Sequence, residues 1–142
     1  MFTVTHHGDT SSVQVDGFVI HDIRGSRVTP RGLNEGIIID PDLALRLVHC
    51  EETMIITGLT VKINDHPVTS FPIHWGPYQV TKIGEMITVD LHHPRPSFHQ
   101  VVTPDRIISR TVIHDHDCII EATAQCLRYH CLTDNSGVEI TL

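Results

Sequence analysis

The chain has 142 residues, the length of one ordinary domain, with a hydrophobic fraction of 40% and a charged fraction of 19%. These values exclude an intrinsically disordered chain, which would have fewer apolar and more charged residues. The formal charge is −7 with neutral histidines, which argues against non-specific binding of nucleic acid, because such binding requires a basic face. We therefore expect one folded domain over residues 1–142 and no nucleic-acid partner.

Isoleucine, threonine and valine are abundant, and alanine is scarce. The chain contains 17 Ile, 15 Thr and 14 Val but only 3 Ala, a balance typical of strands rather than helices. No run approaches the roughly 18 apolar residues of a membrane helix, and residues 1–7 lack the basic region and apolar stretch of a signal peptide. The sequence predicts a mostly β protein without a membrane partner, located in the cytoplasm or within a viral particle.

Alternating apolar and polar positions predict strands in the first half of the chain. Residues 13–16 alternate before Gly17, which permits a bulge or bend, and residues 18–23 continue in extended character. Residues 43–47 also alternate, although Asp40 and Pro41 suit the start of a helix. Strand and helix both remain open for that segment.

Two further strands are bounded by clear turn signals. Residues 59–64 alternate until residues 64–67, where Asn, Asp and Pro favour a turn. Residues 87–92 alternate between Gly84 in front and Pro94 behind. The prolines keep strands short or at sheet edges, because each removes a hydrogen-bond donor from the ladder. Short strands at near-regular spacing predict a compact barrel or sandwich.

The C-terminal region has a different pattern, which predicts one helix. Asp117 suits the N-cap and residues 134–137 suit the end of such a helix. A short final strand over residues 138–142 completes the predicted fold. Seven residues recur at helical spacing, with good helix formers between them. They are Ile119, Ile120, Thr123, Cys126, Leu127, His130 and Cys131.

Histidine is the most over-represented chemical group, with 12 residues against only two lysines. Its unperturbed pKa lies between pH 5 and 8, and it is the commonest metal ligand. Protonation of all 12 would carry the formal charge from −7 to +5, so mild acid would reverse the sign of the molecule. The surplus indicates either a pH-dependent surface or a metal site.

The segment 112–120 is the sharpest candidate for a site. If it is extended, His114, His116 and Cys118 share one face of a strand, and two imidazoles with a thiol form most of a metal site. The alternative is a polar strand end whose histidines form local hydrogen bonds or line an interface. The four cysteines lack a CxxC pair and the spacing of a disulfide scaffold, so we expect reduced thiols.

The spacing from His114 through His116 to Glu121, His-x-His-x4-Glu, resembles the first metal motif of the cupins, which are small β-barrels that bind a divalent metal. That resemblance implies a metal site formed by His114, His116 and Glu121. The metal-binding hypothesis adds Cys118 or His130 as a further ligand, with a divalent transition metal as cofactor. The sequence departs from the cupin pattern at Arg128, where the family has glycine. The chain beyond this point is also too short for the second cupin motif.

Other histidines and cysteines give weaker candidates. Cys126 and His130 would share one face of the predicted helix, as a nucleophile with its base or as two ligands. A small buried hydrophobic thiol is the commoner outcome at such a position. His92 and His93 point to opposite faces of extended chain and cannot jointly bind one metal without a bend.

An aromatic-rich loop over residues 70–78 is a candidate interface. Phe71, His74, Trp75 and Tyr78 lie there among Pro72, Gly76 and Pro77. An exposed loop of this kind contacts a partner or a neighbouring subunit. The alternative is that Trp75 packs over one end of a barrel.

Residues 38–47 followed by Thr57-Gly58-Leu59-Thr60-Val61, together with residues 78–87, resemble the all-β dUTPase and dCTP-deaminase superfamily. The resemblance implies a trimer-forming β scaffold. The catalytic residues do not carry over, because residues 49–53 read His-Cys-Glu-Glu-Thr in place of the phosphate-binding Arg-Ser-Ser element, and paired glutamates repel a triphosphate.

No complete catalytic constellation is present in the sequence. We therefore expect a non-enzymatic, self-associating structural or interaction domain, a homo-oligomer such as a viral or phage component or a degenerate dUTPase-like module. The alternative is a histidine-based metal-binding protein or a metalloenzyme of cupin type.

Overall fold

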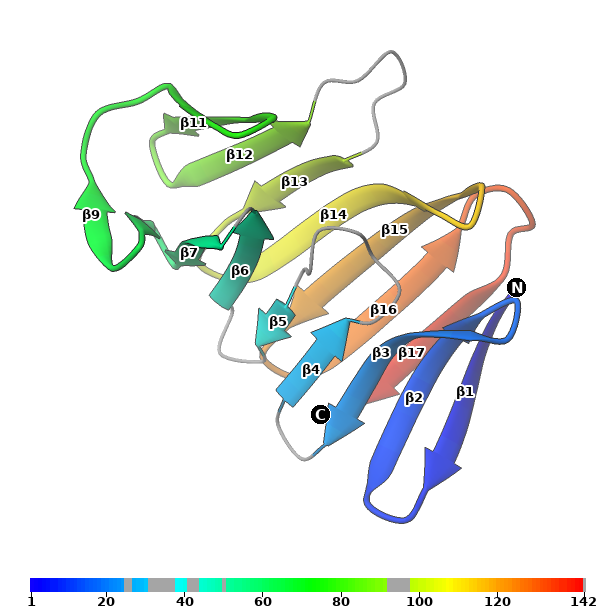
Figure 1. Ribbon diagram of the computed structural model, residues 1–142. Helices are drawn as coiled ribbons and strands as arrows, with labels where there is room; N and C mark the ends of the chain where they lie inside the picture. Colours follow the sequence, from blue (N-terminus) through cyan, green and yellow to red (C-terminus); the bar gives the residue numbers. More distant parts are fainter. Residues whose placement is uncertain (25–26, 31–37, 41–43, 50, 92–97, 142) are drawn as a thin grey trace.

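Short antiparallel strands make up the computed structural model of the protein (Figure 1), which describes residues 1–24, 27–30, 38–40, 44–49, 51–91 and 98–141. Strands that follow one another along the chain also pair with one another, so chain order and sheet order coincide in both sheets. All the pairings are antiparallel, and most of the connections are tight turns. The expected all-β architecture is confirmed.

The strands divide into two sheets of nine and eight strands. The first sheet runs in the order β1 (Phe2–His7), β2 (Thr10–Val15), β3 (Phe18–Arg24), β4 (Arg27–Pro30), β5 (Ile38–Asp40), β6 (Ala44–His49), β7 (Glu52–Thr57), β8 (Thr60–Ile63) and β9 (His66–Val68). The second runs in the order β10 (Ile73–Trp75), β11 (Tyr78–Ile83), β12 (Met86–Leu91), β13 (Phe98–Val102), β14 (Arg106–Ile113), β15 (His116–Thr123), β16 (Cys126–Cys131) and β17 (Gly137–Thr141).

The alternating segments of the sequence form strands because every second side chain is buried. The predicted strands over residues 13–16, 18–23, 59–64, 87–92 and 138–142 overlap β2, β3, β8, β12 and β17, with residues 92 and 142 lying outside the described residues. The ambiguous segment around residue 45 is a strand over Ala44–His49, where Leu45 and Leu47 are fully buried. Asn64 and Asp65 form the predicted turn with positive φ angles of 49° and 65°, a conformation that Asn and Asp tolerate well.

The two sheets share one hydrophobic core, to which both contribute their buried faces. The Phe2 ring of β1 lies 5.6 Å from the Tyr129 ring of β16, and Figure 1 shows β2 to β4 in front of β16 and β17. Neither sheet closes on itself over the described ranges. The barrel alternative is therefore wrong, and the core lies between two open sheets.

The predicted C-terminal helix is also wrong, because residues 116–131 form a β-hairpin. Strands β15 and β16 pair from Cys118↔Cys131 to Ala122↔Leu127. At the turn, the Thr123 hydroxyl accepts hydrogen bonds from the backbone N–H groups of Gln125 and Cys126. β-branched residues at 119, 120 and 123 suit a strand, and the ladder hydrogen bonds override the helix propensity of the residues between them.

The aromatic loop is less exposed than expected. Trp75 and Tyr78 are buried with 4% and 1% of their surface exposed, and their rings stack at 5.7 Å. Gly76 between them has a positive φ of 54°, and a β-carbon there would lie 2.4 Å from the ring of His49. Phe71 is half-buried and His74 is exposed. Exposure of the whole aromatic group is therefore wrong, and Trp75 and Tyr78 belong to the core.

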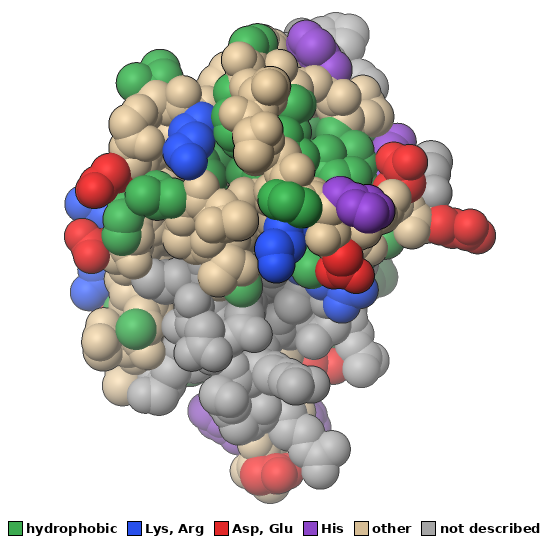
Figure 2. All heavy atoms as spheres, turned by 90° about the vertical axis from the view of Figure 1, so that its left-hand side faces the viewer, with side chains coloured by type: hydrophobic (Ala, Val, Ile, Leu, Met, Phe, Trp, Pro, Cys, Tyr) green, Lys and Arg blue, Asp and Glu red, His purple; other side chains and the backbone are tan. Residues whose placement is uncertain are grey.

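The remaining surface carries charges of both signs. On the face seen from the left of Figure 1, acidic and basic side chains are scattered among hydrophobic and polar ones (Figure 2). Within the described ranges, no helix has the length and apolar character needed to cross a membrane. At the end of the molecule where β15 begins and β16 ends, a histidine, a cysteine and an aspartate of the described residues lie close together.

Candidate metal centre

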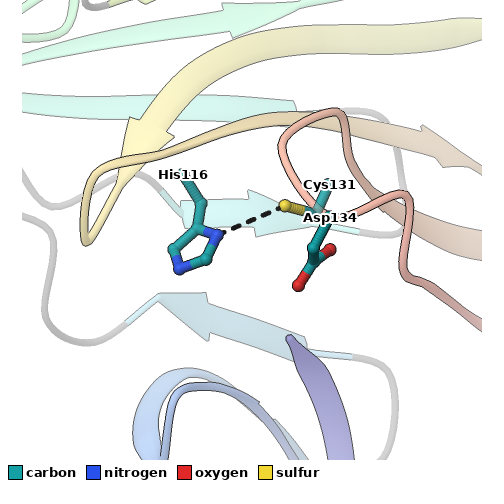
Figure 3. A group of neighbouring side chains, drawn as sticks. All are labelled: His116, Cys131 and Asp134. Carbon is teal, nitrogen blue, oxygen red and sulfur yellow. Dashed lines mark hydrogen bonds between the residues drawn. The ribbon is translucent and has the colours of Figure 1, made fainter.

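Three side chains that could bind a metal meet at the end of the β15–β16 hairpin (Figure 3). His116 is the first residue of β15, Cys131 is the last residue of β16, and Asp134 lies in the loop before β17. One potential ligand atom from each residue lies within 4.8 Å of the other two. Antiparallel pairing places the start of one strand beside the end of the next, which brings together residues that are 15 positions apart in sequence.

The imidazole of His116 is oriented by hydrogen bonds on both ring nitrogens. Its Nε2 lies 2.7 Å from Oδ2 of Asp16, in the turn between β2 and β3 of the other sheet. Its Nδ1 lies 3.5 Å from Sγ of Cys131. Donation of the Nε2 proton to a carboxylate leaves the Nδ1 lone pair facing the thiol. In metal sites, the far nitrogen of a histidine ligand usually donates its proton to a carboxylate, which fixes the orientation of the ring.

The carboxylate of Asp134 is held in place by its own loop. Its Oδ1 accepts hydrogen bonds from the backbone N–H of Ser136 at 2.9 Å and from the Ser136 hydroxyl at 2.6 Å. These bonds, foremost that of the hydroxyl, lower the pKa of Asp134 well below its usual range, with further contributions from Cys131 and from the α-amino group of Met1. Asp134 is therefore an anion at neutral pH, as a metal ligand must be.

The α-amino group of Met1 binds two carboxylates beside this group. It lies 3.0 Å from Oδ2 of Asp134 and 3.0 Å from Oδ1 of Asp16. The pKa of Asp16 is lowered first by this ammonium and second by His116. The ammonium already occupies the free oxygen of Asp134, so a metal ion must compete with it at that carboxylate.

A second thiol lies next to Cys131 in the core. Cys118 of β15 pairs directly with Cys131 of β16, and both side chains are buried. Burial raises the pKa of Cys118 to about 12, with smaller contributions from Cys131 and Asp117. The Cys118 thiol is therefore protonated at neutral pH, and only a cation close by would favour its thiolate.

The predicted metal residues are only partly brought together. His116 is a member of the group, and Cys118 is the cross-strand neighbour of another member. His114 instead lies in the turn between β14 and β15, with a positive φ of 46°, and stacks on the ring of Phe18. Glu121 points to the opposite face of β15 from Cys118 and lies 3.8 Å from Arg106. The turn at His114 breaks the single strand on which the predicted arrangement depended.

Cys131 and Asp134 were not predicted from the sequence as members of this group. Treating residues 119–131 as a helix left no reason to place Cys131 near His116. A hairpin reading with its turn at residues 124 and 125 would have set Cys118 opposite Cys131, since pairing partners lie symmetrically about the turn. Cys126 and His130 do not form a site together, because they lie on one strand about 13 Å apart by strand rise. The pair His92 and His93 lies outside the described residues.

A second group of titratable side chains lies on the outer face of β12 to β15. Cross-strand pairing aligns Asp90 with His99 and His99 with Arg110, beside a surface hollow that Val112 and Asp117 also line. His99 Nδ1 is hydrogen-bonded to Asp90. Arg110 forms a bidentate pair with Asp117 at 3.1 and 2.7 Å. Because His99 and Arg110 each already have an acidic partner, this row is a poorer ligand site than the group around His116.

No protein family model, curated protein or solved structure matches this chain. The resemblance to the dUTPase superfamily therefore stays a prediction, and part of the segment that carries it lies outside the described residues. The function must be argued from the chemistry of the site and from the architecture around it.

Proposed function

We propose that this protein is a non-enzymatic β-domain that binds a divalent transition metal through His116, Cys131 and Asp134. The observation that supports it best is the orientation of His116, whose Nδ1 faces Cys131 Sγ at 3.5 Å while Asp16 holds the other ring nitrogen. One imidazole, one thiolate and one carboxylate are a ligand set suited to Zn²⁺. Zinc is therefore the metal to test first.

The position of the group favours a structural role for the metal. Its ligands come from the ends of two paired strands and from the loop that follows them. Through Asp16, the same group reaches the β2–β3 turn of the other sheet. A metal ion bound there would fix this end of the two-sheet core, and binding to the folded state alone stabilises it.

Metal titration of the full chain, prepared without a histidine tag, tests this proposal. We expect one equivalent of Zn²⁺ by elemental analysis and calorimetry. Co²⁺ should give a thiolate-to-metal absorption band. His116→Ala and Asp134→Asn should each reduce this binding at least tenfold, because each removes one of three ligands. Asp134 is exposed, so its substitution leaves the core intact.

Matched controls use residues of the same chemistry outside the group. His130→Ala and Cys126→Ser, both on the outer face of β16, should leave the stoichiometry and the Co²⁺ band unchanged. Binding that survives both His116→Ala and Asp134→Asn, or an absence of binding in the wild type, would contradict the proposal.

Self-association is a second candidate function, favoured by the exposed apolar side chains at this same end. Met1, Phe18 and Leu132 are 63%, 61% and 44% exposed. Each lies beside the metal group, since Met1 binds Asp16 and Asp134, Phe18 follows the Asp16 turn, and Leu132 follows Cys131. Large exposed apolar groups close together are typical of interaction surfaces. We propose a second copy of the chain as the partner.

Light scattering at varied pH tests this second function. We expect an oligomer that Phe18→Ser dissociates and that changes size between pH 8 and pH 5, because histidine is the residue type that ordinarily gains charge in this range. Ile83→Ser is the control, since Ile83 is exposed at the β11–β12 turn in the other half of the second sheet. A particle of constant size over this pH range, unaffected by Phe18→Ser, would exclude the proposal.

A further inference from the structure

The two buried thiols of the β15–β16 hairpin face each other at a position that favours a covalent bond. Cys118 and Cys131 are direct cross-strand partners, and both are free in the structure. Directly opposite residues in an antiparallel pair have α-carbons about 4.5 or 5.5 Å apart. Both values fall within the range of about 4.4 to 6.8 Å that a disulfide spans.

The backbone hydrogen bonds identify which kind of pair this is. The N–H of Leu132 donates to the carbonyl of Asp117 at 2.8 Å, and the N–H of Cys131 donates to Ser136 rather than to Cys118. Asp117 and Leu132 therefore bond to each other, and the next pair, Cys118 with Cys131, is a non-hydrogen-bonded pair. Side chains approach most closely in pairs of that kind.

The pair also lies where the ladder is easiest to open. Cys131 is the last residue of β16, and strand ends open at lower free energy than strand centres. The Cys131 sulfur contacts His116 Nδ1 at 3.5 Å, and the His116 side chain is 21% exposed. The thiol therefore lies beside a side chain that reaches the protein surface.

We propose that Cys118 and Cys131 form a redox-sensitive dithiol that closes to a disulfide on oxidation by a peroxide. The Cys131 sulfur attacks one peroxide oxygen, the O–O bond breaks, and a sulfenic acid and water result. The Cys118 sulfur then attacks the Cys131 sulfur, the S–O bond breaks, and the hydroxyl leaves as a second water with the Cys118 proton. Two thiols and one hydrogen peroxide give one disulfide and two waters.

Oxidation would remove the soft ligand from the metal group. A disulfide sulfur has no thiolate charge to offer to Zn²⁺. Disulfide formation and metal binding at Cys131 therefore exclude each other, a consequence that rests on the proposed metal-binding function. The dithiol itself requires only the hairpin register.

Oxidation of the metal-free protein with stoichiometric hydrogen peroxide, followed by alkylation and peptide mapping by mass spectrometry, tests the dithiol. We expect a peptide pair joined at Cys118 and Cys131, lighter by about 2 Da for the two hydrogens lost, that dithiothreitol separates. Cys126→Ala should form the same bridge, and Cys118→Ala should not. A sulfinic acid at Cys131 without a bridge, or a bridge to another cysteine, would overturn the inference.

Zinc titration of the oxidised protein tests the coupling. We expect at least a tenfold loss of Zn²⁺ affinity after oxidation and full recovery after reduction. If the wild type binds no metal but still forms the bridge, the metal proposal fails and the dithiol stands. If the wild type binds Zn²⁺ equally well before and after the mapped bridge forms, the coupling is overturned.

Discussion

Two histidines that both connect the sheets occupy opposite environments. His21 of β3 is fully buried, with Nδ1 hydrogen-bonded to the Tyr129 hydroxyl and with no partner for Nε2 among the described residues. His116 of β15 is partly exposed, and both of its ring nitrogens have partners. Burial lowers the pKa of His21 to about 3, although Asp22 opposes the shift. The role of a histidine in this protein is therefore set by its burial and its hydrogen-bond partners, and not by the abundance of histidine in the chain.

The comparison separates a structural histidine from a ligand. His21 lies inside the core, where the charge of the neighbouring Asp22 does not keep it charged. His116 lies at the margin, between an aspartate and a thiol. An imidazole that is to bind a metal needs further ligands beside it, and of these two histidines His116 has them, in Cys131 and Asp134.

Acid should destabilise the protein through His21. The unfolded state binds a proton below about pH 6.5, whereas the folded state stays neutral until its pKa of about 3. The free energy of unfolding should therefore fall as the pH drops from 6.5, by about 3 kcal/mol at pH 4 from this residue alone. Urea denaturation at several pH values measures the slope.

The control for the acid effect is the double variant His21→Leu with Tyr129→Phe, which removes both polar groups from the core. Its stability should decline less steeply between pH 6.5 and pH 4. An unchanged slope would show that other histidines cause the decline. Asp134 and Asp117, whose pKa values are lowered by Ser136 and Arg110 respectively, lose their contribution only below the usual aspartate range near pH 3.8.

Zinc should stabilise the fold through His116 and not through His21. At a free concentration one hundred times the dissociation constant, binding to the folded state alone adds about 2.7 kcal/mol to the free energy of unfolding. His116→Ala should abolish this increment, and the double variant at residues 21 and 129 should keep it. The measurement is denaturant unfolding with and without Zn²⁺ at pH 7.5. An increment that persists in His116→Ala would show that Zn²⁺ does not stabilise the fold through His116.

Tyr129→Phe should cost about 2 kcal/mol of stability, because it leaves the Nδ1 of His21 without a partner in the core. The double variant with His21→Leu should recover part of that loss, since no polar group is then left unpaired. Thermal unfolding of both variants tests the pair. Equal losses in the single and double variants would mean that packing rather than hydrogen bonding dominates there.

Asp16→Asn should weaken Zn²⁺ binding by about tenfold without removing a ligand, because the Asp16 carboxylate orients His116 through its Nε2. Calorimetric titration measures the change. Asp22→Asn is the matched control, since Asp22 of the same sheet is hydrogen-bonded to Ser12 and lies outside the metal group. Equal Zn²⁺ affinities in the wild type and Asp16→Asn would show that Asp16 does not orient His116 for binding and serves only in the ion pair with Met1.

Much of the strand content could be predicted from the sequence. Residues 59–64 and 87–92 alternate in polarity, and β8 and β12 follow because one sheet face is buried. The hairpin over residues 116–131 could not be distinguished from a helix by spacing, because apolar residues three or four apart fit both patterns over two short strands. The site depended on that distinction, so Cys131 and Asp134 were missed while His116 was found.

The sequence alone determined the β character, the negative charge and the surplus of histidine, since composition and local alternation are properties of neighbouring residues. Only the tertiary structure decided which histidine is buried and which one faces a thiol. Those outcomes depend on strand register and on the packing of the two sheets, which join residues as distant as His21 and Tyr129 or Asp16 and His116. No local sequence pattern encodes such a pairing, because it arises only when the two sheets pack against each other.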